Sequence, residues 1–293
     1  MRDDQKMARF TPATPRSRRL GRELRKLREG ASLTLDAAGK QVGSSGSRIQ
    51  RIEAGDIKAR PGDVMELLLA YGVAIDSEPG GSLLVMAREL REAGWWQRLN
   101  TLPPRYATMI AYEEEATEVR NFEPSLIPGL LQTEAYARAV ISVGQETNDE
   151  MIEQRVQARM QRQAILARKQ NRPKLHAVIS EAALRVEVGG AEVMREQLDR
   201  LAAVTTQPNI TVQVLRFAAG AHMANHGGFL ILGLDNDLPL GYIDTLAGAL
   251  FLEARGDLLR LETVYDHLKS LAMSPAESVK FIKERSNAMA QGQ

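Results

Sequence analysis

Cysteine is absent from the 293 residues of this sequence, and its absence excludes disulfide bonds, thiol catalysis and cysteine-ligated metal clusters. Long apolar runs are absent as well, since stretches such as Phe229–Leu232 are far too short to cross a membrane. The first residues also lack the apolar segment that a signal peptide needs. We therefore expect a soluble cytoplasmic protein with no membrane partner, in a reducing compartment.

Net charge is nearly absent too, with 38 Lys and Arg against 37 Asp and Glu. The charges are unevenly distributed, however. The first 60 residues hold 15 basic and 7 acidic side chains, a balance of +8, and the remainder has a balance of −7. A basic end on an acidic body is typical of a protein whose one end meets a polyanion such as nucleic acid. A basic disordered tail would explain Arg2, Lys6 and Arg9, but not the basic residues inside the helical patterns that follow.

Proline, glycine and polar residues divide the chain into four expected segments. They are a flexible leader (1–15), a helical domain (16–80), a linker with a helix at Ser82–Ala93 and a Trp- and Pro-containing stretch (81–105), and a larger domain (106–288). In the leader, we expect Pro12 and Pro15 to break any helix. In the linker, we expect Trp95–Trp96 to pack at a domain or subunit interface.

The first domain shows the apolar spacing of short helices, such as Leu20, Leu24 and Leu27 at i, i+4 and i+7. The expected starts of four successive helices are Ser17, Thr34, Ser45 and Pro61. With the linker helix, they predict a five-helix bundle. The fold class is therefore mainly α, with an α/β second domain.

The second domain alternates strand-like and helix-like runs, which predicts a mixed sheet flanked by helices. The expected strands are Thr117–Phe122, Leu175–Ser180, Ile210–Leu215, Gly228–Leu234, Tyr242–Leu246 and Ala249–Leu252. The expected helices are Thr133–Val143, Asp149–Lys169, Ala191–Thr205, Asp257–Ala272 and Pro275–Ala288.

Two adjacent helices of the first domain have the pattern of a helix-turn-helix. Gly39 supplies the small residue where the helices touch, and Gly43 supplies the unusual backbone angle of the turn. Ile49 and Ile52 anchor the second of these helices. This leaves an outward edge that we expect to enter the major groove of DNA, made of Gly46, Ser47, Arg48, Gln50 and Arg51.

Side-chain chemistry divides the expected DNA contacts into two groups. Arg can bond guanine and Gln can bond adenine through two hydrogen bonds, so the expected base-reading residues are Ser47, Arg48, Gln50 and Arg51. The expected phosphate contacts are Ser32, Thr34, Lys40, Ser45, Lys58 and Arg60, with Arg18 and Arg19 as further candidates. The alternative is a helical bundle whose charges are merely solvated.

The segment Arg51-Ile52-Glu53-Ala54-Gly55 resembles the end of the recognition helix in Xre/Cro-type helix-turn-helix repressors. This resemblance implies an internal ion pair between Glu53 and Arg28, which removes Arg28 from the set of DNA contacts. The chain departs from the family at two positions, since Gly39 replaces the usual Ala, and Gly46 stands where many relatives carry Gln or Pro.

The second domain shows no sequence signature of an enzyme, so we expect no catalytic residues, cofactor or metal. His222 and His226 have the i, i+4 spacing of zinc ligands but lie in a Gly-flanked loop, which favours loop packing over metal or small-molecule contact. We expect His176 to be a hydrogen-bonded core residue. The arginines of the Asp149–Lys169 helix, Arg155, Arg159 and Arg162, indicate a solvated face or a docking surface for an acidic partner.

Several blocks of the second domain occur in the order found in a large actinobacterial family. The blocks are Tyr112-Glu-Glu-Glu-Ala116, Pro128-Gly-Leu-Leu-Gln-Thr-Glu-Ala-Tyr-Ala-Arg138, Arg159-Met-Gln-Arg-Gln163, Ile179-Ser-Glu-Ala-Ala-Leu-Arg185, Gly189–Gly190, Gln197-Leu198 and Val212-Gln-Val-Leu215. With Trp95–Trp96, they make the chain resemble Xre-type regulators of the WhiJ kind. The resemblance implies an antitoxin-like regulator whose larger domain binds a small partner protein, a ligand, or both.

Together, these observations predict a homodimeric, nucleoid-associated repressor that reads a palindromic operator in double-stranded DNA and is controlled through its larger domain by a small protein or small-molecule effector. One alternative is an antitoxin-like protein that mainly neutralises a small partner and binds DNA only to regulate its own synthesis. The other is an enzyme hidden in the larger domain, which would need a polar pocket with perturbed carboxylates.

Overall fold

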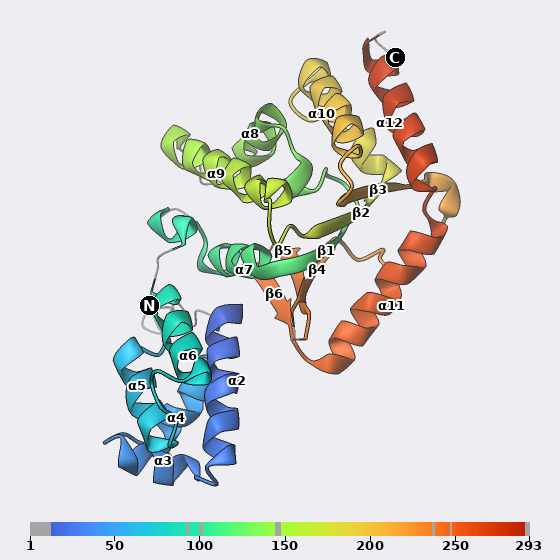
Figure 1. Ribbon diagram of the computed structural model, residues 1–293. Coiled ribbons are helices and arrows are strands. Elements are labelled where there is room, and N and C mark those ends of the chain that lie inside the picture. Colours follow the sequence, from blue (N-terminus) through green and yellow to red (C-terminus); the bar gives the residue numbers. More distant parts are fainter. Residues whose placement is uncertain are drawn as a thin grey trace, which may run out of the picture. The chain divides into compact units, whose positions relative to one another are not determined.

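The structure is a computed structural model that describes residues 13–91, 94–99, 102–143, 148–235, 238–246 and 248–290. The chain forms two compact units, residues 1–98 and 99–293, and each unit is described by itself (Figure 1). The first unit is helical and the second combines a sheet with helices, so the predicted fold class is confirmed. The expected leader lies outside the described residues as far as Pro12.

The first unit is a bundle of short helices around one apolar core. The helices are α2 (Pro15–Gly30), α3 (Leu35–Gln41), α4 (Gly46–Glu53), α5 (Pro61–Ala70), α6 (Glu78–Glu89) and the 3-10 helix η1 (Trp95–Arg98). The core buries Leu24 of α2, Ile49 of α4, and Leu67 and Leu68 of α5 almost completely. Trp95 and Trp96 contact each other edge to face in η1, with ring centroids 5.7 Å apart.

Helix α2 begins earlier than the sequence predicted. The Oγ1 atom of Thr14 accepts a hydrogen bond from the backbone N–H of Ser17 at 3.3 Å, so Thr14 caps the helix in place of Ser17. Pro15 occupies the first turn and does not break the helix, because its missing N–H would have had no helical partner there. The Ser17 side chain is buried instead.

Helix α6 also begins earlier, and it is a component of the first unit. Ser77 caps it by accepting a hydrogen bond from the N–H of Gly80 at 3.2 Å, and Pro79 lies in its first turn. Gly80 and Gly81, which stand at the expected boundary between the helical domain and the linker, therefore lie inside the helix. Because Leu83, Leu84, Ala87 and Leu90 pack in the bundle core, α6 belongs to the bundle and not to the expected linker.

The second unit is built on one mixed sheet of six strands in the described part of the chain. The strands are β1 (Ala116–Glu123), β2 (Lys174–Ser180), β3 (Ile210–Leu215), β4 (Phe229–Leu234), β5 (Leu240–Thr245) and β6 (Gly248–Leu252). Their order is β3-β2-β1-β4-β5-β6, in which β1, β2 and β3 are parallel and the other pairings are antiparallel. Each predicted strand is within two residues of an observed one.

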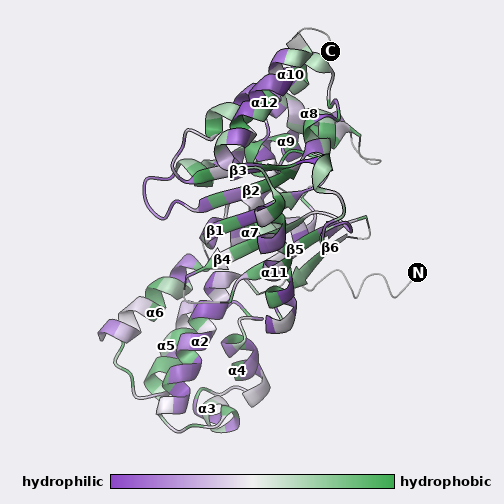
Figure 2. Ribbon diagram, turned by 90° about the vertical axis from the view of Figure 1, so that its right-hand side faces the viewer, coloured by the Kyte–Doolittle hydropathy of each residue, from purple (hydrophilic) through white to green (hydrophobic). Residues whose placement is uncertain are grey.

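Helices cover both faces of this sheet. They are α7 (Pro104–Glu115), α8 (Glu134–Ser142), α9 (Asp149–Arg162), α10 (Ala191–Val204), α11 (Arg255–Leu271) and α12 (Pro275–Ala290), with 3-10 turns η2 (Gly129–Leu131), η3 (Gln163–Ala167), η4 (Glu181–Leu184) and η5 (Phe217–Ala219). Figure 1 shows α8, α9, α10 and α12 grouped on one side and α11 on the other. The larger core lies on the first side, and a smaller core that includes Phe122, Val178 and Tyr265 lies under α11. Helices α10 and α12 carry both apolar and polar residues, as amphipathic helices do (Figure 2).

Sequence reasoning missed one helix of the second unit. Pro103 and Pro104 fall in the expected linker (81–105), but Pro104 begins α7, because proline fits the first turn of a helix. Helix α7 buries Met109, Ile110 and Tyr112. The helix observed in place of the predicted Asp149–Lys169 helix is also shorter, because α9 ends at Arg162 and the chain continues as η3.

Two of the three arginines of α9 contact groups within the second unit, so the expectation of a solvated or docking stripe was wrong for Arg159 and Arg162, whereas Arg155 is half-buried. Arg162 is buried and donates two hydrogen bonds to the Glu113 carboxylate, Nε to Oε2 at 2.7 Å and Nη2 to Oε1 at 2.8 Å. It also donates to the hydroxyl of Tyr106. Burial alone would lower the pKa of Arg162, but Glu113 and Tyr106 raise it above the usual range. Arg159 donates to Oε1 of Gln132 at 3.0 Å.

Of the two histidines that raised the question of a metal, His222 has local partners and His226 is exposed. Nδ1 of His222 accepts a hydrogen bond from the N–H of Ala224 at 3.2 Å, and its ring contacts Phe122 edge to face. This is the loop packing that the sequence favoured. Among the described residues, no group of three His, Cys, Asp or Glu side chains could hold a metal ion, and no helix is long and apolar enough to cross a membrane.

Candidate nucleic-acid interface

Two polar side chains begin the helices of the expected helix-turn-helix. Oγ1 of Thr34 accepts a hydrogen bond from the N–H of Ala37 at 3.2 Å at the start of α3, and Oγ of Ser45 accepts one from the N–H of Arg48 at 3.2 Å at the start of α4. Each satisfies an N–H that the first turn leaves without a helical partner. The sequence therefore dictates where both helices begin.

The turn between α3 and α4 depends on two glycines. A Cβ atom on Gly39 would lie 2.8 Å from the backbone carbon of Ser45, so only glycine allows α3 to approach the start of α4 this closely. Gly43 has a φ of +63°, in the left-handed region that favours glycine. Both roles are those that the sequence predicted.

One side of α4 is fixed in the core and the other is open to solvent. Ile49 and Ile52 are buried to 1% and 2% exposure. The exposed residues of α4 and its C-cap, spaced at i, i+3, i+4 and i+7, are Ser47, Gln50, Arg51 and Ala54, and we call them the exposed stripe. A helix held by its apolar side presents this stripe without a change of conformation.

Gly46 does not belong to the exposed stripe, although the sequence analysis placed it on the outward edge. It is buried at the first position of α4, where a Cβ atom would lie 2.1 Å from Oδ1 of Asp36 on α3. The outward edge therefore begins at Ser47. The absence of a side chain at residue 46 reflects contact between the two helices.

Arg48 differs from the expected base-reading group as well. Its Nη2 atom lies 3.2 and 3.3 Å from the two carboxylate oxygens of Asp63 in the first turn of α5. Oδ2 of Asp63 also accepts a hydrogen bond from the N–H of Arg60 at 2.9 Å, so the carboxylate is held by its own helix. The Arg48 guanidinium is therefore directed toward α5. Local sequence patterns do not indicate this partner, because Asp63 is 15 residues away from Arg48.

The ion pair that the Xre/Cro resemblance implied is present. Nε and Nη2 of Arg28 lie 2.7 and 2.9 Å from the carboxylate oxygens of Glu53, and Nη1 donates to the carbonyl of Leu33 at 2.7 Å. The hydrogen bond that Arg28 donates to Glu53 raises the pKa of Arg28. Burial, and then the Glu53 charge, raises the pKa of the neighbouring Tyr71 hydroxyl to about 12. The pair links the end of α4 to α2, and Arg28 also links both to the loop that follows α2.

The expected phosphate contacts fall into three groups. Lys40, Lys58 and Arg60 have exposed side chains that form no ion pair in the part of the chain that the structure describes, and the same holds for the expected base reader Arg51. Thr34 and Ser45 already serve as cap acceptors, so only their hydroxyl protons are available to an anion. Ser32 is exposed, with a positive φ of 55°, and the two further candidates Arg18 and Arg19 lie on α2.

The helix-turn-helix therefore exposes two polar side chains that can contact bases, Gln50 and Arg51, together with cations that form no ion pair in the described structure. Gln50 offers an amide with both a donor and an acceptor, and Arg51 offers a fork of donors. Both lie on a helix whose orientation is fixed by buried isoleucines. This is the arrangement that direct reading of base edges requires.

Comparison with known families agrees with this geometry. A helix-turn-helix domain matches residues 19–78, which span α3, the turn and α4. A domain of unknown function (DUF5753) matches residues 106–284, more than half of the chain. The chain belongs to the DUF5753 family. In this DUF5753 protein the helix-turn-helix domain supports a role as a DNA-binding regulator. No curated protein and no solved structure matches the chain.

Proposed function

We propose that this DUF5753 protein is a sequence-specific transcriptional regulator whose helix α4 enters the major groove of double-stranded DNA. The observation that carries the proposal is the exposed stripe on a helix anchored by Ile49 and Ile52. Helix-turn-helix proteins use this half of the second helix to contact base edges.

Contacts with bases and phosphates are divided among different side chains. Gln50 and Arg51 contact base edges because they are long, exposed and lie side by side, and Ser47 contacts the base nearest the start of α4. Lys40, Lys58 and Arg60 neutralise phosphates. Arg48 does not read a base, because Asp63 holds its guanidinium group.

The regulator acts as a homodimer on a palindromic operator. One small helix-turn-helix buries too little surface for nanomolar specificity, and a two-fold axis doubles the contact with DNA. We infer that the module is of the Xre type, on the basis of its Arg28–Glu53 pair, and that bound protein blocks transcription.

The second unit controls DNA binding through a small partner protein or a small molecule. Its sheet and helices form a folded body larger than the first unit, and this body carries most of the acidic charge of the chain. We propose that it acts by binding and catalyses no reaction. Release of DNA on addition of the correct partner or ligand would support this role.

The experiment that tests the proposal starts from selection of a preferred sequence out of random duplex DNA by the full chain. The double variant Gln50→Ala, Arg51→Ala should bind the selected sequence at least about 100-fold more weakly than the natural chain, because each good base contact contributes about 1–3 kcal/mol. Circular dichroism and thermal melting should be unchanged, since both side chains are exposed.

The matched control is Arg88→Ala, which removes the same charge from an exposed position on α6. It should bind the selected sequence nearly as tightly as the natural chain. Equal affinities of the double variant and the control for the selected sequence would reject α4 as the reading helix. Failure to select any preferred sequence would reject sequence-specific binding altogether.

A further inference from the structure

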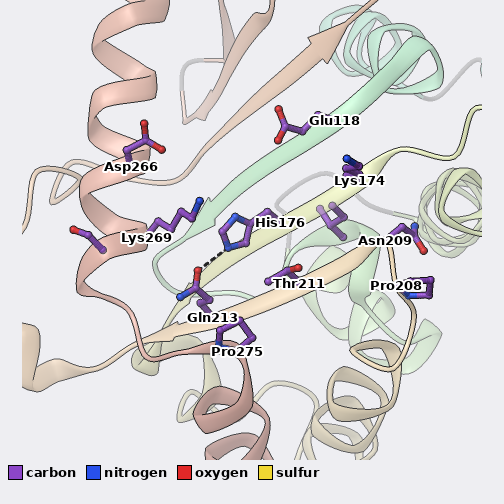
Figure 3. Close-up of a pocket in the computed structure, with 12 residues that line it drawn as sticks. Glu118, Lys174, His176, Pro208, Asn209, Thr211, Gln213, Asp266, Lys269 and Pro275 are labelled. Carbon is purple, nitrogen blue, oxygen red and sulfur yellow. Dashed lines mark hydrogen bonds between the residues drawn. The ribbon is translucent and has the colours of Figure 1, made fainter.

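Helix α11 covers only part of the second face of the sheet. The smaller core beneath it ends at residues such as Val178 and Tyr265, and the first residues of β2 and β3 extend beyond it. A cavity of about 700 Å³ lies there, within the size range of small-molecule sites. Its lining comes from β1, β2, β3, α11 and the start of α12 (Figure 3).

Hydrogen bonds order the floor of this cavity and fix its donor and acceptor pattern. Nε2 of Gln213 donates to the carbonyl of Met273 at 2.7 Å, so the Gln213 Oε1 atom must be the acceptor in its 2.7 Å contact with Nε2 of His176. Nε2 of His176 therefore carries the proton. In the neutral ring, Nδ1 is then an acceptor, and it has no hydrogen-bond partner among the described residues.

The His176 ring is also held in place from the side. Its ring contacts Tyr265 edge to face at a centroid distance of 5.7 Å, and the Tyr265 hydroxyl donates to the His176 carbonyl at 2.6 Å. Burial, and to a smaller extent the Lys269 charge, lowers the pKa of His176, although the hydrogen bond with Gln213 opposes this. The neutral ring is therefore the resting form near neutral pH.

Cationic groups flank the ring. In Figure 3 the Lys269 side chain extends from α11 toward His176, and Lys174 lies on the other side of the ring in this view. Within the described chain, neither ammonium group forms an ion pair. The Thr211 hydroxyl on β3 also lines the cavity, and it has no hydrogen-bond partner among the residues that the structure describes.

The acidic groups of the lining limit which anion fits. Glu118 is paired with Arg120 at 3.2 Å, and Asp266 lies on α11 one turn from Lys269. These carboxylates, together with the lone pair on Nδ1 of His176, disfavour a doubly charged phosphate. A single carboxylate near the lysines, with a nearby O–H or N–H for Nδ1, satisfies Lys174, Lys269 and His176.

We propose that this cavity binds a small organic acid that also carries a hydroxyl or amino group. The ligand carboxylate accepts hydrogen bonds from Lys269 and Lys174, and the ligand hydroxyl or amino group donates to Nδ1 of His176. The proposal concerns the second unit alone and stands whether or not the first unit binds DNA. If the proposed regulation also holds, this cavity is where a small-molecule effector enters.

The test uses the full chain labelled with ¹⁵N at its four histidines, whose ring nitrogens are observed by long-range ¹H–¹⁵N spectroscopy. The variant His176→Gln assigns the signals of this ring. In the free protein, Nε2 should be protonated and Nδ1 should not be. Glycerate and serine are the probes, and acetate is the matched anion without a donor.

Glycerate or serine should shift the Nδ1 signal of His176 in a saturable way, and acetate should bind at least several-fold more weakly. Lys269→Ala should weaken binding about tenfold or more, as expected for a lost charge-assisted hydrogen bond. Lys283→Ala, an exposed lysine on α12, should bind the probe like the natural chain. No saturable shift with either probe up to tens of millimolar, or unchanged binding by Lys269→Ala, would overturn the proposal.

Discussion

Arginines at helical spacing occur in both units, and they do opposite things. On α4 of the first unit, Arg48 is paired with Asp63, but Arg51 is exposed and forms no ion pair in the described structure. The nearby cations Lys40, Lys58 and Arg60 are also exposed and form no ion pair there. On α9 of the second unit, Arg162 is buried against Glu113 and Arg159 bonds Gln132. One set of cations is available to a polyanion, and the other holds the fold together.

The difference lies in what each arginine faces across the fold, and not in the local sequence. The arginines of α9 lie at i, i+4 and i+7 and those of α4 at i and i+3, so each helix shows one charged stripe. In the second unit, a carboxylate 49 residues earlier lies opposite that stripe. Charge patterning therefore indicates an interface only where no buried partner is present.

Removal of the second unit's buried pair should have the largest effect. Arg162→Ala leaves the Glu113 carboxylate buried without a counterion and should lower the free energy of unfolding by about 3–5 kcal/mol. Chemical denaturation of the full chain, followed by circular dichroism, measures the change. Replacement of both partners by apolar residues, Arg162→Met with Glu113→Leu, should restore most of the loss. A loss below 1 kcal/mol for Arg162→Ala would place this arginine with the solvated charges after all.

Removal of the first unit's ion pair should lower the free energy of unfolding somewhat less. The Arg28 and Glu53 side chains are 9% and 5% exposed, against 6% and 1% for Arg162 and Glu113, so water compensates part of the loss. We expect Glu53→Ala to lower the stability of the first unit by about 3 kcal/mol. DNA affinity should fall in parallel with the folded fraction, as measured by thermal melting and binding at the same temperature. Full affinity combined with normal melting would show that the pair does not hold α4 in place.

A half-buried carboxylate at the end of β1, Glu123, should make the second unit sensitive to pH. Burial raises the pKa of Glu123 to about 7, despite opposing effects of Asn121 and Arg159. Since the folded state holds the proton more tightly than the unfolded state, stability should fall as the pH rises from about 4.5 through 7. Glu123→Gln should therefore be more stable than the natural chain by roughly 2–3 kcal/mol at pH 8, and no more stable below pH 4.5. Denaturation at both pH values checks this, with the exposed Glu187→Gln as control. A pH-independent difference would refute the raised pKa.

The free cations of the first unit should give the smallest single effects. Lys58→Ala should weaken binding to all duplex sequences about equally and reduce the slope of log affinity against log salt by about 1. The fold should be unaffected, because the side chain is exposed. Titrations at several salt concentrations measure the slope. An unchanged slope would remove Lys58 from the phosphate contacts.

Local signals predicted much of the fold. Caps at Thr34 and Ser45, the turn at Gly43 and the apolar spacing of Ile49 and Ile52 are all encoded within a few residues, and the structure has each of them. The strands were also located well, because buried β-branched and aliphatic runs are short and continuous.

The errors share a physical cause. A proline can either begin or end a helix, and a charged side chain can either remain in solvent or pair with a distant group. Pro15 and Pro104 begin helices, although a proline equally well ends one, and only the packed helix distinguishes the two cases. Arg48 and Arg162 each face a carboxylate that is distant in the sequence. In the candidate interface, the exposure of Arg51 and Gln50 could be predicted, because neither side chain faces such a carboxylate in the described structure.

The central claim is that the exposed stripe on α4 reads bases, and the most direct measurement is the base preference of single variants at each position of the selected operator. Arg51→Ala should lose discrimination at one base pair in each half-site, by about 1–3 kcal/mol, and keep its preferences elsewhere. A uniform loss of affinity at every position, or an unaltered preference at all of them, would contradict base reading by this helix.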